Sequence, residues 1–399
     1  MRRSAPIGFL AIVLAVIGNG CGPRGSSELR TAVANREVKQ VVNALRNMRI
    51  IVSTDDDAQI TAIDAAPLRE YFNLNVTDAD LRELAKLAKR GQLDRLEVLD
   101  LTFCTEVTDS GCSHLLALKY LKKLRMSRVP IGDTGVRRIA TMTQLEELDL
   151  SVTKITPAGV RYLGELADLK SLNLAIVKID DDCLSTLAGL KQLETLSLRD
   201  TPITGAGLAH LTGLPKLKRL DLGITTLTDE GLAMVANLQS LEELDIGSTD
   251  ITSAGLVHLQ ELKSLVELSL PRTDITGEAL VSLSGLSNLQ RLDLHQTRIG
   301  NVGVQHLASL SELKTLNLDD CLIDDGAVVH LAQLSSLEVL RIWNARLSDA
   351  GLEQLQQLTN LTQLWLFGTQ VTDEGIGRFR EAMPEVDVDG PAGEPISSY

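Results

Sequence analysis

A leucine pattern with a nearly constant period of 24 residues constrains this chain more than any other feature of its sequence. The first interval is 25 residues, and every later interval is 24. Each of these leucines is followed three residues later by a second leucine, and then two residues further on by Leu, Ile or Met. A fixed period of this length indicates a repeat protein. The leucines that open the twelve copies are Leu96, Leu121, Leu145, Leu169, Leu193, Leu217, Leu241, Leu265, Leu289, Leu313, Leu337 and Leu361.

Each copy predicts one β-strand, a turn and one short helix. Leu196 and Leu198 lie two residues apart, so both side chains point to the same side of a strand. Thr204 is a favoured N-cap residue, and Leu208 and Leu211 follow it with helical spacing. No copy can bury its leucines alone, so neighbouring copies must stack and share one core.

The first copy carries a recognisable motif. It reads Leu96-x-x-Leu99-x-Leu101-x-x-Cys104-x-x-Val107-Thr108-Asp109-x-Gly111. This motif resembles the leucine-rich-repeat family, and within it the ribonuclease-inhibitor-like, cysteine-containing branch; the later copies resemble the shorter bacterial form with Thr in place of Cys. The resemblance covers about residues 70 to 390. It implies a right-handed α/β solenoid, shaped as a horseshoe, with a parallel concave sheet and helices on the convex side. A fold of this kind does not by itself specify a function.

The first residues have the layout of a secretory signal peptide. Arg2 and Arg3 precede an apolar run over residues 7–17, which is too short to span a bilayer. The small residues that end in Cys21 resemble a bacterial lipobox, although Gly18 stands where that motif usually has Leu. The resemblance implies that Cys21 is lipidated and that the protein is lipid-anchored in the cell envelope. Ordinary signal-peptidase cleavage, giving a secreted or periplasmic protein, and an uncleaved anchor are the alternatives.

These features divide the chain into five segments. Within the N-terminal cap, residues 34–48 predict a helix, residues 49–52 and 60–63 predict strands, and residues 75–87 form a degenerate half-repeat. Residues 386–388 predict a short closing strand. The five segments are a signal peptide at 1–20, a tether at 21–33, the N-terminal cap at 34–95, the solenoid of twelve full repeats at 96–384, and a cap strand with a disordered tail at 385–399.

The net charge of the chain argues against a nucleic-acid partner. The 39 Lys and Arg residues are outnumbered by 53 Asp and Glu residues, which gives a net charge of −14. Affinity for a phosphate backbone depends on Lys and Arg displacing counterions, so an acidic chain is a poor candidate. We expect contact with a membrane only through the N-terminal lipid.

Three groups of residues are of types that occur in catalytic or metal sites, but their positions within the repeat explain them without such a site. Five histidines occupy the same position in the helix of their repeats, which predicts a row of side chains on the convex side and no metal site. The cysteines of the repeats predict buried thiols, with a Cys104–Cys112 bridge as the alternative. The aspartate runs fall at helix N-caps and first turns, which explains them without calcium. We therefore expect no metal, no cofactor and no enzyme, and the pair His295 and Asp319 is the single catalytic candidate. The five histidines are His114, His210, His258, His306 and His330.

The side chains that alternate with the buried leucines of each strand point to the concave face. In the last two repeats this face carries the residues that we call the aromatic–arginine cluster: Arg341, Trp343, Trp365 and Phe367. Strands about 4.8 Å apart place Trp343 beside Phe367 and Arg341 beside Trp365, where a cation–π pair can form. We predict that the cluster anchors a partner, with His295, Asp293 and Asp319 beside it. The alternative is that the aromatic rings shield the end of the solenoid.

The middle of the same face carries a second group, which we call the acidic centre: Asp221, Glu243, Asp245 and Glu267. Like charges on neighbouring strands destabilise a sheet, so the group favours a cationic segment of the partner. A solvated face without a partner is the alternative.

The function that these features predict is non-catalytic binding of a protein or peptide on the concave face, at a bacterial cell envelope. The alternative is a secreted leucine-rich-repeat effector or a substrate-receptor-like adaptor. A recruiting module such as an F-box would mark the latter, and none is visible in residues 28–95. The identity of the partner and the oligomeric state stay open.

Overall fold

The structure is a computed structural model that describes residues 51–55, 60–64 and 76–390. The chain forms two compact units, Met1–Leu196 and Ser197–Tyr399, which we call the N-terminal and C-terminal units. The expected signal peptide, the tether with Cys21, the cap helix at 34–48 and the tail at 391–399 lie outside the described residues. Within the described ranges, no helix is long and apolar enough to cross a membrane.

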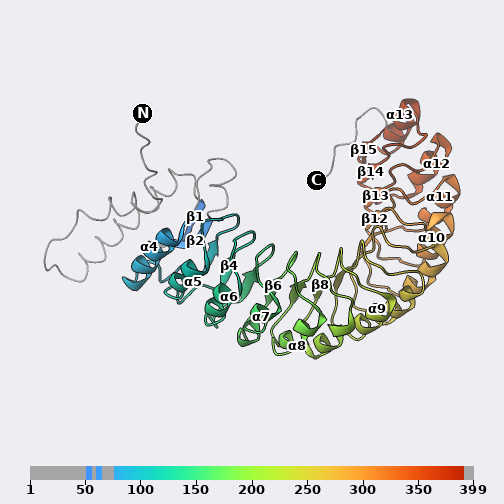
Figure 1. Ribbon diagram of the computed structural model, residues 1–399. Coiled ribbons are helices and arrows are strands. Elements are labelled where there is room, and N and C mark those ends of the chain that lie inside the picture. Colours follow the sequence, from blue (N-terminus) through green and yellow to red (C-terminus); the bar gives the residue numbers. More distant parts are fainter. Residues whose placement is uncertain (1–50, 56–59, 65–75, 391–399) are drawn as a thin grey trace, which may run out of the picture. The chain divides into compact units, whose positions relative to one another are not determined.

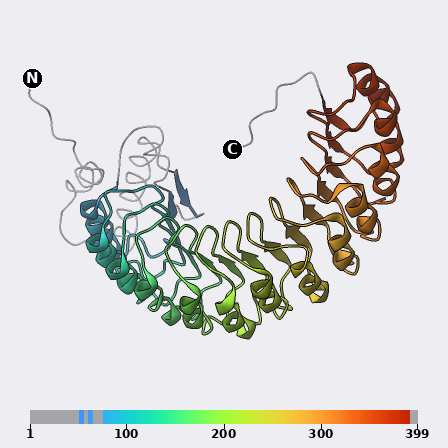
Figure 2. The ribbon, with the colours of Figure 1, turned by 45° about the vertical axis from the view of Figure 1, so that its right-hand side comes forward.

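The N-terminal unit opens with two antiparallel strands, β1 (Ile51–Thr54) and β2 (Ile60–Asp64), which end two residues and one residue later than predicted. From β2 to β6, neighbouring strands are parallel and follow the chain order. Helices cover one side of these strands (Figures 1 and 2). The further elements are α4 (Asp78–Lys89), β3 (Val98–Asp100), α5 (Asp109–Leu115), β4 (Lys123–Arg125), α6 (Asp133–Ile139), β5 (Glu147–Asp149), α7 (Pro157–Val160), the 3-10 helix η1 (Leu163–Glu165), β6 (Ser171–Asn173), the 3-10 helix η2 (Asp181–Cys183) and α8 (Leu184–Leu187), and β7 (Thr195–Ser197) spans the unit boundary.

The C-terminal unit repeats the same alternation through to β15, and its neighbouring strands are parallel. Its strands line the inner side of a curve and its helices line the outer side (Figure 1). The predicted α/β solenoid of strand, turn and helix is therefore confirmed. The elements are η3 (Ala206–Gly213), β8 (Arg219–Asp221), α9 (Asp229–Val235), β9 (Glu243–Asp245), η4 (Gly255–Glu261), β10 (Glu267–Ser269), η5 (Gly277–Leu283), β11 (Arg291–Asp293), α10 (Gly300–Leu307), β12 (Thr315–Asn317), α11 (Asp325–Leu331), β13 (Val339–Arg341), α12 (Asp349–Gln354), η6 (Leu355–Gln357), β14 (Gln363–Trp365), α13 (Asp373–Ala382) and β15 (Asp387–Asp389).

Three repeats of the C-terminal unit carry a 3-10 helix where the pattern predicts an ordinary helix. In these repeats Gly205, Ser253 and Gly277 stand where most other copies have Asp. An aspartate in the first turn stabilises an α-helix through the helix dipole, and glycine is a poor helix former. Asn301 also replaces this Asp in α10, which is an α-helix, and η2 is a 3-10 helix that begins at Asp181, so the loss of the aspartate favours the tighter 3-10 turn but does not by itself determine it.

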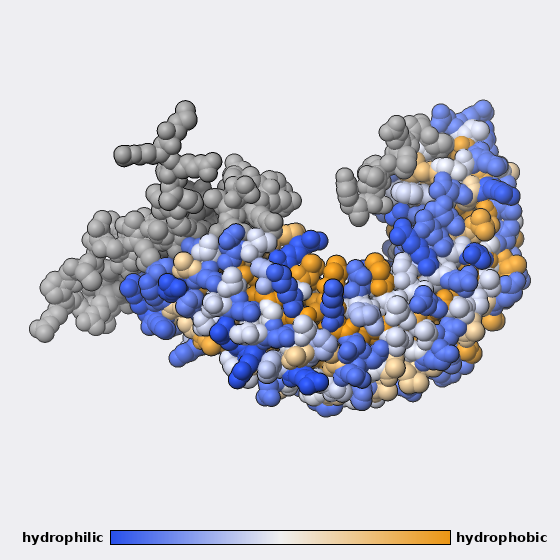
Figure 3. Space-filling view, viewed as in Figure 1, coloured by the Kyte–Doolittle hydropathy of each residue, from blue (hydrophilic) through white to orange (hydrophobic). Residues whose placement is uncertain are grey.

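The repeat leucines form the core, and buried threonine hydroxyl groups close the turns of five successive repeats, from Thr201 to Thr297. Leu220 and Leu222 are both buried. The Oγ1 atoms of Thr225 and Thr273 donate hydrogen bonds to the carbonyl groups three residues earlier, at 2.6 and 2.7 Å. In the repeat at β12, the thiol of Cys321 occupies this position. The surface over the helices is mostly hydrophilic (Figure 3), as the inward direction of the leucines requires.

An aspartate at the start of a helix also holds the next repeat, a role that the sequence pattern did not predict. Asp325 accepts from the backbone N–H and the hydroxyl of Ser348, at 2.8 and 2.5 Å. Its carboxylate fills the space over Gly351, where an added Cβ would lie 2.2 Å from Asp325 Oδ1. Asp349 makes the same two bonds to Thr372. Neighbouring repeats are thus joined by a carboxylate that requires a glycine beside it.

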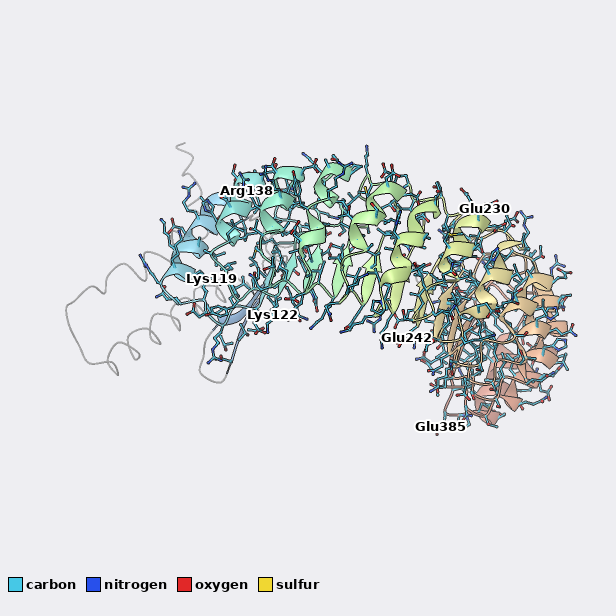
Figure 4. All side chains as sticks on the ribbon, turned by 90° about the horizontal axis from the view of Figure 1, so that it is seen from below. Lys119, Lys122, Arg138, Glu230, Glu242 and Glu385 are labelled. Atoms are coloured by element: carbon cyan, nitrogen blue, oxygen red, sulfur yellow. The ribbon has the colours of Figure 1, made fainter. Side chains whose placement is uncertain are left out.

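Alternating charges join the repeats where the strands begin. Lys122 Nζ lies 2.8 Å from Glu97 in the N-terminal unit, and Lys218 Nζ lies 2.8 Å from Glu242 in the C-terminal unit. Lys122 and Glu242 both project from the margin of their own unit (Figure 4). Because these pairs are exposed, we expect each to stabilise the fold only slightly.

Candidate functional site

The aromatic–arginine cluster forms on β13 and β14 as the strand register predicts. Arg341 is the direct partner of Trp365 in the parallel pair. Its guanidinium carbon lies 4.7 Å from the ring centroid of Trp343 and 5.6 Å from that of Trp365. Trp343 and Phe367 meet edge to face, with centroids 5.5 Å apart and an angle of 84° between the ring planes. The predicted neighbour relations and the cation–π contact are confirmed, and the three aromatic side chains are half-buried.

Asp319 holds this cluster from the neighbouring repeat. Its side chain is only 7% exposed, and its Oδ2 accepts from Nε and Nη2 of Arg341 at 3.0 and 2.8 Å. Its Oδ1 accepts from the backbone N–H of Trp343 at 2.8 Å. Burial raises the pKa of Asp319, while the Trp343 N–H and the Arg341 charge act in the opposite direction.

The bond from Asp319 replaces one that other repeats make within their own strand. Asp293 accepts from the N–H of His295 at 3.0 Å, and Asn317 accepts from the N–H of Asp319 at 3.1 Å. In the next repeat the position of Asp293 and Asn317 is occupied by Arg341, whose side chain has no acceptor atom for the N–H of Trp343. Arg341 thus contacts two indole rings, and Asp319 of the previous repeat supplies the acceptor for the N–H of Trp343 that the arginine cannot provide.

His295 and Asp319 do not form the catalytic pair that the sequence suggested. His295 Nδ1 lies 3.0 Å from Asp293 Oδ1, while both oxygens of Asp319 bind Arg341 and Trp343. Neighbouring strands bring the two residues to the same face, but each has a different partner. The structure thus gives no geometric support to this histidine as a general base activated by Asp319.

Each carboxylate of the acidic centre has an arginine partner. Arg219 Nε lies 2.9 Å from Glu243, and Arg291 Nε lies 2.6 Å from Glu267. Arg199 Nη1 bridges the remaining two, at 2.9 Å from Asp245 and 3.5 Å from Asp221. Three arginines thus face four carboxylates, so most of the repulsion from which we predicted a cationic partner segment is compensated within the C-terminal unit, and one net negative charge is left.

The three arginines are the residues that the sequence interpretation missed. Glu243 faces Arg219 across the parallel pair of β8 and β9, and Glu267 faces Arg291 across β10 and β11. Opposite charges at the same repeat position in neighbouring copies were the signal that could have identified them. The pKa of Asp245 is nevertheless raised, first by burial and also by the charge of Asp221.

The cysteines of the repeats are not reactive groups. Cys104, Cys112, Cys183 and Cys321 are buried free thiols, so the alternative of a Cys104–Cys112 bridge is excluded. Burial raises the pKa of Cys112 to about 12 and that of Cys321 to about 11, which disfavours the nucleophilic thiolate. Within residues 51–55, 60–64 and 76–390, no group of three or more His, Cys, Asp or Glu side chains is arranged to hold a metal ion.

Comparisons with known proteins agree with this architecture. A family model described as "Leucine-rich repeat region" matches residues 157–382, and a second, "Leucine Rich repeat", matches residues 96–116. No curated protein matches the chain. The solved structure of an internalin (inlF) from Listeria monocytogenes is 20% identical over 96% of this chain and 94% of its own, with a TM-score of 0.56. That of a leucine-rich-repeat protein from Leptospira interrogans is 21% identical over 82% of this chain and 98% of its own, with a TM-score of 0.45.

Proposed function

Because the chain belongs to the leucine-rich repeat family, we propose that it is a non-catalytic binding module whose aromatic–arginine cluster anchors a protein or peptide partner. Solenoids of this kind present extended surfaces on which partners bind. The single observation that carries the proposal is the position of Arg341 against the rings of Trp343 and Trp365. Tryptophan and arginine dominate the binding energy of protein interfaces, and here they are ordered before a partner arrives.

The contacts behind the cluster favour binding over mere shielding of the end of the solenoid. A shield needs only apolar rings, whereas this cluster includes a charged arginine held by the nearly buried carboxylate of Asp319. Taking such a pair out of water is costly, and apolar residues of the same size would stabilise a fold at least as well. The arrangement is therefore better explained by a binding surface.

We propose further that the module is displayed from a bacterial cell envelope through a lipid on Cys21. The support is the cationic start at Arg2 and Arg3, the apolar run and the small residues before Cys21. Labelling cells with a palmitate analogue tests this part. Wild-type protein should carry the label and Cys21→Ser should lose it. An unlabelled wild-type protein would reject the anchor without affecting the binding proposal.

The binding proposal is tested by crosslinking and capture from envelope extract with wild-type protein and a Trp343→Ala/Trp365→Ala variant. The matched control is Phe103→Ala, which removes an exposed ring that also contacts an arginine, Arg128, at 5.2 Å. A partner captured by the wild type and the control should be lost from the double variant, with affinity weakened by at least about 2 kcal/mol. If the double variant melts at a lower temperature but binds equally well per folded molecule, the cluster is only a shield.

A further inference from the structure

We propose that residues 391–399 of this chain dock on the aromatic–arginine cluster and there compete with the partner. The docking requires only the cluster itself, whereas the competition rests on the proposed function. The inference comes from where the chain leaves β15, from the chemistry of the residues that follow, and from two sets of unused donors in the cluster.

The chain leaves β15 directly beside the cluster. β15 runs parallel to β14, with Asp389 opposite Trp365, and the N–H of Leu366 donates to the carbonyl of Asp389 at 2.8 Å. Gly390 therefore begins at the end of β14 that carries Phe367. Nine extended residues reach about 30 Å, and neighbouring strands are about 4.8 Å apart. Residues 391–399 are thus long enough to return across β14 and β13.

The composition of this segment suits an aromatic surface. It contains Pro391, Pro395, Ile396 and Tyr399, and Glu394 is its only charged side chain. Proline-containing segments bind to aromatic-lined surfaces because their extended conformation is largely preformed, which lowers the entropy cost of binding.

The charge state of the cluster also fits such an occupant. Asp319 already neutralises Arg341, so a strongly charged segment would gain little there. Arg341 uses Nε and Nη2 for this pair, and its Nη1 makes no hydrogen bond within the described residues. That edge of the guanidinium can donate to backbone carbonyl groups, which every peptide segment provides.

One indole group lacks an acceptor that an occupant could supply. Trp343 Nε1 is buried and has no hydrogen-bond partner within the described residues. A buried donor without a partner is unfavourable, and native proteins rarely leave one. Residues 391–399 lie outside the described residues and begin next to the strand that neighbours Trp343, so their carbonyl groups are suitable acceptors.

The two tryptophans of the protein both lie in the cluster, so its intrinsic fluorescence reports on this site alone. We would compare the full chain, a chain that ends at Gly390, and a full-length variant with Pro391→Ser, Pro395→Ser and Ile396→Ser. We expect both altered chains to emit at longer wavelength and to be quenched more strongly by acrylamide than the full chain. A synthetic peptide of residues 391–399 should reverse the effect in the truncated chain at about millimolar concentration, since the tether supplies a similar effective concentration.

Equal emission and quenching in all three chains would overturn the proposal. The difference must also persist on dilution; if it disappears, the segment comes from a second copy and docking within one chain is rejected. Partner capture separates the two proposals. If the segment docks and the truncated chain captures more partner than the full chain, both the docking and the competition are supported. Docking with equal capture by both chains rejects the competition. Docking without capture by either chain rejects the proposed function and leaves the docking intact.

Discussion

Asp319 accepts a hydrogen bond from the backbone N–H of Trp343 at 2.8 Å, although the two residues belong to successive repeats. The same carboxylate holds the side chain of Arg341. One nearly buried group therefore fixes both the backbone and the guanidinium of the proposed anchor. A solenoid in which each repeat touches only its neighbours can build a site in this way without any long-range contact.

A substitution of Asp319 should destabilise the protein less when the new side chain can still accept a hydrogen bond. Asp319→Ala leaves the Trp343 N–H and the Arg341 charge without partners, and we expect a loss of about 1–3 kcal/mol in the free energy of unfolding. Asp319→Asn keeps an acceptor and should lose less. Urea unfolding followed by tryptophan fluorescence measures both. Asp389→Ala, at an exposed position on β15, should change stability by less than about 0.5 kcal/mol. Equal losses for the Ala and Asn variants would show that the acceptor has no role.

The raised pKa of Asp319 predicts a specific pH dependence of stability. Between the ordinary value of 3.8 and the raised value, the folded protein binds a proton that the unfolded chain does not. The stabilisation from this protonation is complete below 3.8 and is lost as the pH rises through the raised pKa. Asp319→Asn cannot titrate, so the stability of the wild type relative to this variant should fall as the pH rises above 3.8. Asp245 shifts in the same direction but is present in both proteins, so it cancels. A difference that is independent of pH would contradict the assignment.

The sequence was sufficient for the fold and for the membership of the cluster. A period of 24 residues fixes the repeat, and the two-residue spacing within each strand fixes which side chains share a face. The contacts of Trp343 with Phe367 and of Arg341 with Trp365 follow from these two facts, because parallel strands in register place equivalent positions side by side.

The contacts that Arg199 and Asp319 make with neighbouring repeats could not be predicted from the sequence of one repeat at a time. Asp221 and Asp245 look like a repulsive pair until Arg199, from another repeat position, is placed between them. The role of Asp319 was hidden for a similar reason, since its partners are in the next repeat and one of them is a backbone N–H. The side-chain pairs that Arg199 and Asp319 form join residues at two different positions of the repeat, and a pattern that aligns equivalent positions does not display them.

Arg199 should stabilise the fold mainly by separating two carboxylates. Arg199→Ala leaves Asp221 and Asp245 opposite each other in β8 and β9, and we expect a loss of about 1 kcal/mol at neutral pH. In an Asp245→Asn background the loss should be smaller, because the repulsion is then absent. The control is Arg298→Ala, which removes an exposed pair with Asp274 and should cost less than about 0.5 kcal/mol. An unchanged loss in the Asn background would mean that Arg199 acts through packing.

The last prediction concerns the contact between Asp325 and Gly351 that joins two repeats. Gly351→Ala would place a Cβ 2.2 Å from Asp325 Oδ1 and 2.6 Å from Leu347 Cδ1. We expect it to destabilise the protein by about 1–3 kcal/mol through overpacking. Gly377→Ala is the matched control, because nothing lies within 4 Å of its added Cβ. It lies inside α13 and should stabilise by about 0.5–1 kcal/mol through helix propensity.

The chain itself contains the compensating arrangement for this contact. Ser253 stands where Asp325 does in its own repeat, its hydroxyl accepts from the N–H of Thr276 at 2.9 Å, and the small position of the next repeat is Ala279. Asp325→Ser should therefore recover much of the stability lost in Gly351→Ala, although Asp325→Ser alone weakens the contact with Ser348. Urea unfolding of the two single variants and the double variant gives the coupling energy. If the two losses simply add, the carboxylate is not what excludes a side chain at position 351.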